Sequence, residues 1–171
     1  DLMINISASP FDYTHVEDRK AIIKANVKKY QLPLFYCNGA GSQTEIIFDG
    51  GSMVFDKDAN LIAEGKYFEE DSVMTEISDE GIFKNEILAV ANEVPDQELN
   101  PQVYDCQLNI DKIHDAIVMG IRDYFAKMGF TKAILGSSGG IDSAVTLALA
   151  CTALGKENVR GVLMPSQYST S

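Results

Sequence analysis

Apolar residues recur at two spacings along this chain, and together these spacings predict an α/β protein. In residues 15–30 and 109–128 they return every three or four positions, which is typical of a helix with one buried face. Asn109 is the predicted cap of the second helix and Gly129 its predicted stop. A third apolar segment, residues 144–154, predicts another helix.

Short apolar runs between turn residues predict the strands. The runs at residues 2–6 and 33–38 carry almost no polar side chains, so we expect both strands to be buried. The further predicted strands are residues 45–48, 52–55, 61–64, 72–77, 132–135 and 159–164.

A change of character near residue 78 predicts two domains. Acidic residues become frequent there, and Pro95 and Pro101 interrupt the stretch that follows. We interpret this stretch as a connector with a short helix over residues 85–91. The predicted boundaries are residues 1–84 for the first domain, 85–104 for the connector and 105–171 for the second domain.

The stretch with the clearest chemistry is Leu-Gly-Ser-Ser-Gly-Gly-Ile-Asp-Ser, residues 135–143, between a predicted strand and a predicted helix. Adjacent glycines let the backbone turn tightly and approach a ligand, and the first amides of a helix attract anions. The carboxylate of Asp142 would repel a bare anion, so it indicates a magnesium ion between it and a polyphosphate. The candidate nucleotide-binding residues are Gly136, Ser137, Ser138, Gly139, Gly140, Ile141, Asp142 and Ser143, with Asp142 as the metal ligand.

This stretch differs from the two common phosphate-binding loops. It lacks the lysine of the mononucleotide P-loop, and its glycine spacing is not that of the dinucleotide fingerprint. Residues 138–143 do resemble the Ser-Gly-Gly-x-Asp-Ser signature of the ATP pyrophosphatases, the PP-loop enzymes. The resemblance implies cleavage of ATP between the α- and β-phosphates and adenylation of a substrate. An ordinary glycine-rich turn without a ligand is the simpler alternative.

The surroundings favour one branch of the PP-loop enzymes. Residues 120–143, 154–159 and 161–166 resemble the NAD synthetase family almost throughout. In that family a Met-Pro-Ser-x-Tyr-Ser-Ser segment opens a mobile loop over the ATP and deamido-NAD site, and residues 164–170 are similar to it. The implied loop residues are Pro165, Ser166, Gln167, Tyr168 and Ser169, with Gln167 at a position that is often arginine.

The first part of the chain resembles a different family. Residues 4–11 and 38–52 look like the C-terminal half of a nitrilase-like amidase domain. Such a domain ahead of an NAD synthetase domain is the arrangement of the glutamine-dependent NAD synthetases. The resemblance implies a glutamine pocket with Ser7, Ser9 and Arg19 as possible contacts. A helix-surface ion pair for Arg19 and ordinary turn hydroxyls for the serines are equally good interpretations.

The implied fold is the C-terminal part of a nitrilase-like α-β-β-α domain, followed by the start of a Rossmann-like PP-loop domain with a parallel sheet. The implied reaction amidates deamido-NAD to NAD, using ATP, Mg²⁺ and ammonia released from glutamine. The family's Glu-Lys-Cys glutaminase triad is expected upstream, so no catalytic residue is assigned here and we expect the chain to be an internal fragment. Another PP-loop amidotransferase, GMP- or asparagine-synthetase-like, and an inactive nucleotide-binding protein are the alternatives.

Composition narrows the partners. The net charge of −11 argues against nucleic acid or an anionic membrane as the main partner and is ordinary for a cytoplasmic enzyme. We therefore expect small-molecule substrates and a cytoplasmic location. A homo-oligomer is also expected. Cys37 is predicted to be a buried strand residue, because it lacks the nitrilase Cys-Glu-Asp context of the nucleophile. Structural roles are expected for Cys106 and Cys151, and surface or packing roles for His15 and His114.

Overall fold

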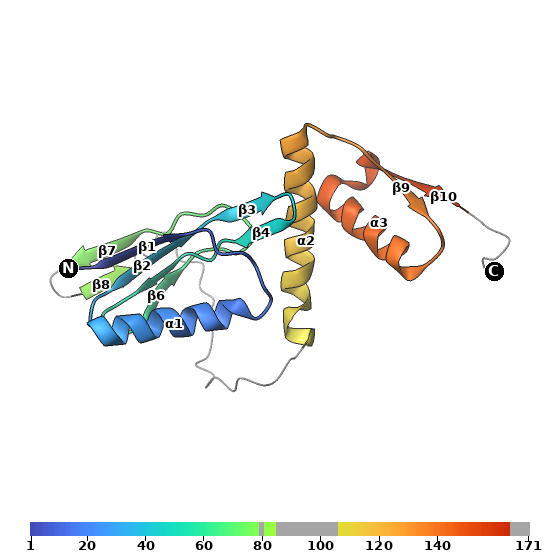
Figure 1. Cartoon of the computed structure of the whole chain (residues 1–171). Helices are drawn as coiled ribbons and strands as arrows, with labels where there is room; N and C mark the ends of the chain where they lie inside the picture. The colour runs from blue at the N-terminus through green and yellow to red at the C-terminus, as the bar shows by residue number, and fades with distance from the viewer. Residues whose placement is uncertain (79–80, 85–105, 165–171) are drawn as a thin grey trace. The chain divides into compact units, whose positions relative to one another are not determined.

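The computed structural model describes residues 1–78, 81–84 and 106–164 (Figure 1). They divide into two compact units. The first unit contains residues 1–40 and 48–110, and the second contains residues 41–47 and 111–171. The whole predicted connector (residues 85–104), with its short helix, and the predicted mobile loop at 165–169 lie outside the described residues. The predicted domain boundaries therefore stay a prediction.

The first unit is built on a four-stranded sheet of order β1-β2-β5-β6. β1 (Met3–Ser7) pairs in parallel with β2 (Leu34–Asn38), and α1 (His15–Tyr30) lies between them in the chain. β5 (Met53–Phe55) and β6 (Leu61–Glu64) continue the sheet in antiparallel pairs.

The helix lies along one face of this sheet (Figure 1). It has the bounds that its apolar spacing predicts, and Gln31 ends it in the left-handed conformation (φ 54°) two residues before Pro33. The core forms where its buried side chains meet the inward residues of the strands. The buried core residues are Ile23, Val27, Leu34, Tyr36, Met53, Phe55 and Ala59. Truncating one of the larger side chains to alanine costs about 2–5 kcal/mol in such a core.

Two predictions are wrong for the face of β1 and β2 that points away from α1. Ile4 and Ile6 are 70% and 83% exposed, and Cys37 is exposed as well. Side chains alternate across a strand, and the helix covers only one side of β1. The apolar run correctly predicts strand β1, but no residue of this strand is fully buried, and only Met3 and Ser7 are partly buried. Cys37 is therefore a strand residue but not a buried one.

Two hairpins add four strands to those of the four-stranded sheet. β7 (Thr75–Ser78) pairs with β8 (Gly81–Lys84), a strand that follows the change of character near residue 78 and lies within residues 1–84. β3 (Ala40–Gln43) pairs with β4 (Ile46–Asp49), and β3 was not predicted because its alanine, glycine, serine and glutamine carry no apolar signal.

The second unit contains a parallel βαβ arrangement. β9 (Ala133–Ser137) leads into α3 (Ile141–Leu154), and a short 3₁₀ turn (Lys156–Asn158) precedes β10 (Val159–Leu163), which pairs with β9. On one side, the side chain of Leu147 approaches Gly161, whose added Cβ would lie 3.5 Å from it.

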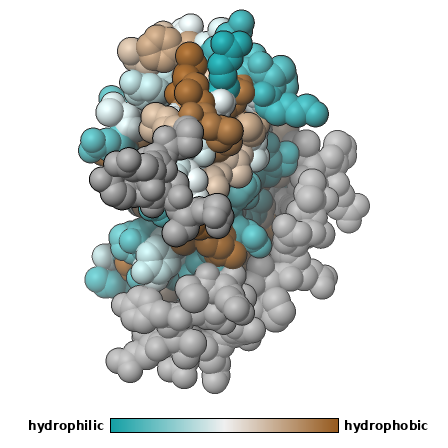
Figure 2. All heavy atoms as spheres, turned by 90° about the vertical axis from the view of Figure 1, so that its right-hand side faces the viewer, coloured by the Kyte–Doolittle hydropathy of each residue, from teal (hydrophilic) through white to brown (hydrophobic). Residues whose placement is uncertain are grey.

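Apolar side chains also reach the surface of this unit. Ile134 is 74% exposed and Leu163 is 80% exposed. Figure 2 faces the right-hand end of Figure 1 and shows hydrophobic atoms at the surface beside polar ones. By alternation along the strands, Leu163 lies on the same face as Gly161 and Ile134 on the opposite face. Parallel strands are usually covered on both faces, so these two strands have the character of an interior sheet that exposes an apolar side chain on each face among the described residues.

The long helix α2 (Cys106–Met128) belongs to this unit from Asp111 onward. It starts three residues before Asn109, which is therefore inside the helix and is not its cap. Gly129 ends the helix with φ 72°, as predicted.

The hairpin tip at residues 41–47 belongs to the second unit, where it contacts α2. The backbone N–H of Ser42 donates to the Asp123 carboxylate at 2.8 Å, and its hydroxyl donates to the carbonyl of Gly120 at 3.5 Å. The Lys127 ammonium group donates to the Ser42 carbonyl. Ser42 is only 3% exposed, so these bonds satisfy polar groups that water does not reach.

Candidate functional site

The glycine-rich turn lies between β9 and α3. Gly139 has φ +88°, a left-handed conformation that favours glycine over residues with a Cβ. Gly140 is extended (φ −82°, ψ 160°) and occupies the N-cap position of α3. The sequence folds this way because two glycines follow a strand and an apolar helical segment comes next.

The start of α3 presents free hydrogen-bond donors. The N-cap residue offers no side-chain bond to the helix, and the turn's first helical bond joins Ala144 N–H to Gly140 O at 3.2 Å. The amides of Ile141, Asp142 and Ser143 precede that bond, so they lack an intrahelical acceptor. Helix amides of this kind, at the positive end of the helix dipole, bind phosphate.

The serine hydroxyls are arranged less uniformly than the sequence suggests. Ser143 donates its hydroxyl to Gly140 O at 2.9 Å, so in this structure it bonds the turn itself. Ser138 is exposed, whereas Ser137 is half-buried at the end of β9. The structure thus brings residues 138–143 together as one exposed turn.

The three glycines serve different needs. A Cβ at Gly139 would meet nothing within 4 Å, and one at Gly140 would lie 3.7 Å from Ser138 Oγ. Glycine at 139 is therefore required by its backbone angle, and at 140 the open space leaves room for a ligand to approach the amides. Gly136 lies inside β9, where a Cβ would be 2.8 Å from the end of the Met164 side chain.

Asp142 is exposed in the first turn of α3. Within the described residues no group of three or more His, Cys, Asp or Glu side chains could hold a metal ion by itself. Magnesium bound with a nucleotide needs only one or two carboxylates, since phosphate oxygens and water supply its other ligands. One carboxylate beside a phosphate-binding turn fits that donor set.

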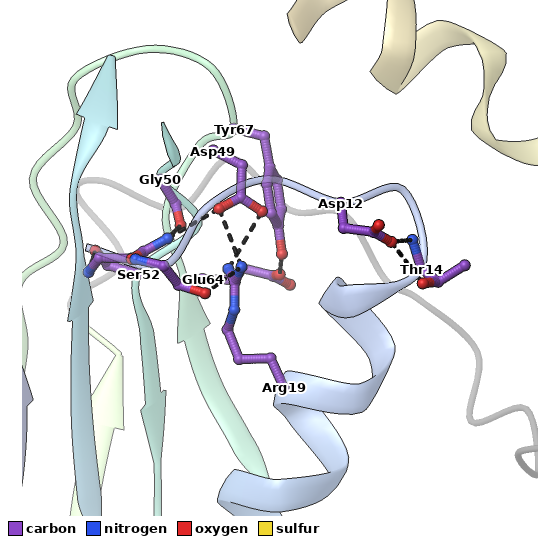
Figure 3. Close-up of polar contacts among 10 residues, drawn as sticks. Asp12, Thr14, Arg19, Asp49, Gly50, Ser52, Glu64 and Tyr67 are labelled. Carbon is purple, nitrogen blue, oxygen red and sulfur yellow. Dashed lines mark hydrogen bonds and ion pairs between the residues drawn. The ribbon is translucent and has the colours of Figure 1, made fainter. Parts of the chain in front are cut away.

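A second polar cluster lies inside the first unit, where α1 meets the sheet (Figure 3). Arg19 donates from Nη1 to Asp49 Oδ2 at 3.2 Å and from Nη2 to Asp49 Oδ1 at 3.1 Å. The two residues are 8% and 0% exposed. This is a buried bidentate ion pair, in which each charge depends on the other because water is excluded.

Asn38 joins this pair to the loop after β1. Its amide nitrogen donates to Asp49 Oδ1 and to Gly50 O, both at 2.9 Å, and its Oδ1 accepts the Ser9 N–H at 2.9 Å. Its own backbone N–H donates to Ser52 Oγ at 3.1 Å. Asn38 is buried, and every polar atom of its side chain has a partner.

A neighbouring cluster joins α1 to β6. Lys20 forms an ion pair with Glu64 at 3.0 Å, and the Tyr67 hydroxyl donates to the same carboxylate. Burial and the charge of Glu64 raise the pKa of Tyr67 far above its ordinary value, so the phenol stays protonated. Gly51 (φ +63°) allows this packing, because an added Cβ would lie 2.3 Å from the Tyr67 ring.

Two of the three predicted glutamine-pocket residues lie together, and the third does not bond to them. Arg19 and Ser9 lie together, with Nη2 donating to Ser9 Oγ at 3.3 Å. Ser7 instead donates its hydroxyl to Asn5 Oδ1 at 3.1 Å. The ion pair of Arg19 is buried, which corrects the helix-surface alternative.

Sequence reasoning missed Asn38 and Asp49 as members of the buried cluster. Both occur beside glycines, where a polar residue normally indicates an exposed turn. His15 is exposed, and so is His114, which contacts Asp115 at 2.9 Å. No helix in the described part of the chain is long and apolar enough to cross a membrane.

The strand, the left-handed glycine turn and the helix with free amides form an α/β unit of the kind that can bind phosphate. Comparison with known proteins is more specific. The profile of the NAD synthase family matches residues 113–171. This match covers about a third of the chain.

Relatives match almost the whole chain. The glutamine-dependent NAD(+) synthetase of Synechocystis sp. is 38% identical over 172 residues, which cover 99% of this chain and 28% of the relative. The enzyme of the same name from Thermotoga maritima is 35% identical over 187 residues, covering 99% of this chain and 32% of the relative. The chain thus spans about a third or less of the length of these relatives.

A solved structure agrees with both matches. The glutamine-dependent NAD+ synthetase from Acinetobacter baumannii, in complex with ADP, superposes with a TM-score of 0.80 at 31% identity. The match covers 98% of this chain and 30% of that one. The mixed α/β fold with parallel strands is therefore that of a segment of an NAD synthetase.

Proposed function

We propose that this chain is part of a glutamine-dependent NAD synthetase, which amidates deamido-NAD to NAD with ATP, Mg²⁺ and ammonia from glutamine. The observation that carries the proposal is the exposed turn at residues 138–143, whose helix amides have no intrahelical acceptor. It lies in the segment matched by the NAD synthase family, and the rest of the chain is similar to glutamine-dependent members.

The second unit supplies the nucleotide-binding turn in this proposal. The free amides of α3 hold phosphate oxygens of ATP, and Asp142 would hold the magnesium ion that accompanies them. Magnesium, when bound, neutralises phosphate charge. A carboxylate is a poor electrophile, and adenylation gives the deamido-NAD carboxylate AMP as a leaving group for ammonia. The chain's own share is positioning and charge stabilisation. Residues 165–169 are proposed to contact substrate, on their resemblance to the family's loop.

The first unit is proposed to be the C-terminal half of the nitrilase-like glutaminase domain. Its support is the resemblance of residues 4–11 and 38–52, and the similarity of the whole chain to enzymes named for glutamine dependence. The glutaminase triad of Glu, Lys and Cys would lie elsewhere in the protein. Ser9 remains the proposed glutamine contact in this chain, since it is half-exposed and its loop is anchored.

Replacing Asp142 tests the metal role in the protein that contains this chain. Asp142→Ala should lower ammonia-dependent NAD synthesis by about a hundredfold or more, because a ligand of the phosphate-bound ion is lost. It should also remove the magnesium dependence of ATP binding, measured by calorimetry with and without Mg²⁺. Asp111→Ala, an exposed aspartate on α2, is the matched control and should change neither measurement.

Two results would contradict this proposal. Retained NAD synthesis in Asp142→Ala would refute the metal role. Pyrophosphate release by the unsubstituted protein with xanthosine monophosphate or aspartate, but not with deamido-NAD, would assign it to another PP-loop amidotransferase.

A further inference from the structure

We propose that Asn38 and Arg19 are positioning residues that fix Ser9 for contact with the amide substrate. The inference rests on the proposed glutaminase function of the first unit. The proposal assigns Arg19, Asn38 and Asp49 to the support of the glutamine pocket. These three residues are buried and do not themselves touch a substrate.

The place of Ser9 in the fold favours a ligand contact. Ser9 lies in the loop that leaves the carboxyl end of β1, and β1 pairs in parallel with β2, which ends at Asn38. Ligands of α/β sheets bind beyond the carboxyl ends of parallel strands. Ser9 is half-exposed there, whereas Arg19, Asn38 and Asp49 are 8%, 6% and 0% exposed.

Both polar groups of Ser9 are held by the buried cluster. Its backbone N–H donates to Asn38 Oδ1 at 2.9 Å. Its hydroxyl oxygen accepts a bond from Arg19 Nη2 at 3.3 Å. Because the guanidinium occupies the oxygen as a donor, the hydroxyl hydrogen is directed to an acceptor. The carboxylate or the side-chain carbonyl of glutamine provides such an acceptor.

The cluster behind Ser9 has little freedom to rearrange. Asp49 accepts two bonds from Arg19 and one from Asn38, and Asn38 also donates to Gly50 O. No buried side-chain polar atom in the described part of the chain lacks a partner. Breaking one of these bonds without replacing it would leave a buried donor or acceptor unpaired, which is costly at low dielectric. The result is a preorganised hydroxyl on a buried support.

Asn38→Ala tests this inference in the protein that contains the chain. It should raise the KM for glutamine in NAD synthesis by about tenfold or more, since Ser9 loses its backbone anchor. The ratio of glutamine-dependent to ammonia-dependent synthesis at low glutamine should fall by the same factor. Asn26→Ala is the matched control, because Asn26 is exposed and bonds only its own helix at Ile22 O.

Arg19→Lys is the second variant. It tests whether the buried cluster positions Ser9 if Asn38→Ala does not fold. Lysine keeps the charge beside Asp49 but lacks the planar fork that reaches both Asp49 and Ser9. It should raise the glutamine KM as Ser9→Ala does. The Arg19→Lys, Ser9→Ala double variant should be no worse than Ser9→Ala, because Arg19 acts through that hydroxyl.

Three outcomes would overturn the inference. The first is an unchanged glutamine KM in both positioning variants. The second is an equal loss of glutamine- and ammonia-dependent synthesis, which would indicate a purely structural role. The third is additivity of the two substitutions. If the unsubstituted protein makes no NAD from either nitrogen source, the proposed function fails and this inference fails with it. NAD synthesis by the unsubstituted protein with any of the first three outcomes overturns the inference alone.

Discussion

At the scale of single residues, the buried charges of the first unit behave differently from the exposed ones. Arg19 and Asp49 are paired out of reach of water, whereas the Lys66–Glu69 pair is exposed on both sides. Exposed pairs contribute little to stability, but a buried charge that loses its partner is strongly destabilising. A sequence pattern shows which residues are charged, but it does not show that Asp49, in an Asp-Gly-Gly turn, would be fully buried.

Asp49→Ala should therefore lower the free energy of unfolding of the first unit by about 3–5 kcal/mol, because it leaves the Arg19 guanidinium buried and unpaired. Urea unfolding followed by circular dichroism measures this change. Asp58→Ala, an exposed aspartate in a turn of the same unit, should change the stability by less than about 0.5 kcal/mol. Equal effects of the two substitutions would show that the Arg19–Asp49 ion pair does not stabilise the folded state in the way expected of a buried pair.

Asp12 provides a titration that can be followed directly. The hydroxyl and the backbone N–H of Thr14 donate to its carboxylate, at 2.6 and 2.8 Å, and hold the pKa of Asp12 below its ordinary value of 3.8. Since this pKa is lower in the folded state, the associated stability is present above the unfolded pKa. It is lost as the pH falls through the folded pKa.

Thr14→Val removes the hydroxyl donor but keeps the N–H. The pKa of Asp12 should therefore rise toward 3.8, and the stability linked to it should shrink. Carboxyl-carbon NMR of Asp12 over an acid titration measures the shift. An Asp12 pKa that is the same in both proteins would show that the hydroxyl bond has no electrostatic effect.

At the scale of elements, the sequence predicts what local periodicity determines. α1 has its predicted bounds because its apolar spacing, Gln31 and Pro33 all agree on where it ends. α2 begins before Asn109, because residues 106–108, which precede the predicted cap, already form helix. β3 has no apolar signal, and its tip is held by Asp123, a residue 81 positions away. Such long-range contacts cannot be inferred from a local pattern.

The turn between β9 and α3 separates a conformational need for glycine from a functional one. Gly139→Ala should cost about 1–2 kcal/mol of stability, because alanine is strained at φ +88°. Gly140→Ala has no such strain and meets only Ser138 Oγ at 3.7 Å, so it should change stability little. It should nevertheless weaken ATP binding, since its methyl group lies where a phosphate approaches the amides.

Thermal unfolding and nucleotide binding of the two variants check this separation. The unsubstituted protein and Ala148→Gly, a change on the exposed side of α3, are the comparisons. If Gly140→Ala binds ATP as tightly as the unsubstituted protein, the turn does not hold the nucleotide in the way proposed.

At the scale of the whole molecule, short motifs indicate a family but do not reveal the site. The Ser-Gly-Gly-x-Asp-Ser stretch and its neighbours predict an NAD synthetase segment, and residues 113–171 match the profile of the NAD synthase family. The exposure of Ile4, Ile6 and Cys37 could not be predicted, because an apolar strand in sequence does not reveal which of its faces is covered. The relatives are about three times as long as this chain, and the rest of the proposed site would correspond to parts of them that this chain does not match.

The proposed reaction has one direct test, the fate of the amide nitrogen of glutamine. The protein that contains this chain is supplied with deamido-NAD, ATP, Mg²⁺ and glutamine labelled with ¹⁵N in its side-chain amide. If the proposed function is right, we expect ¹⁵N in the carboxamide of the NAD product, with one AMP and one pyrophosphate released for each NAD formed. Unlabelled NAD, or cleavage of ATP to ADP in place of AMP, would contradict it.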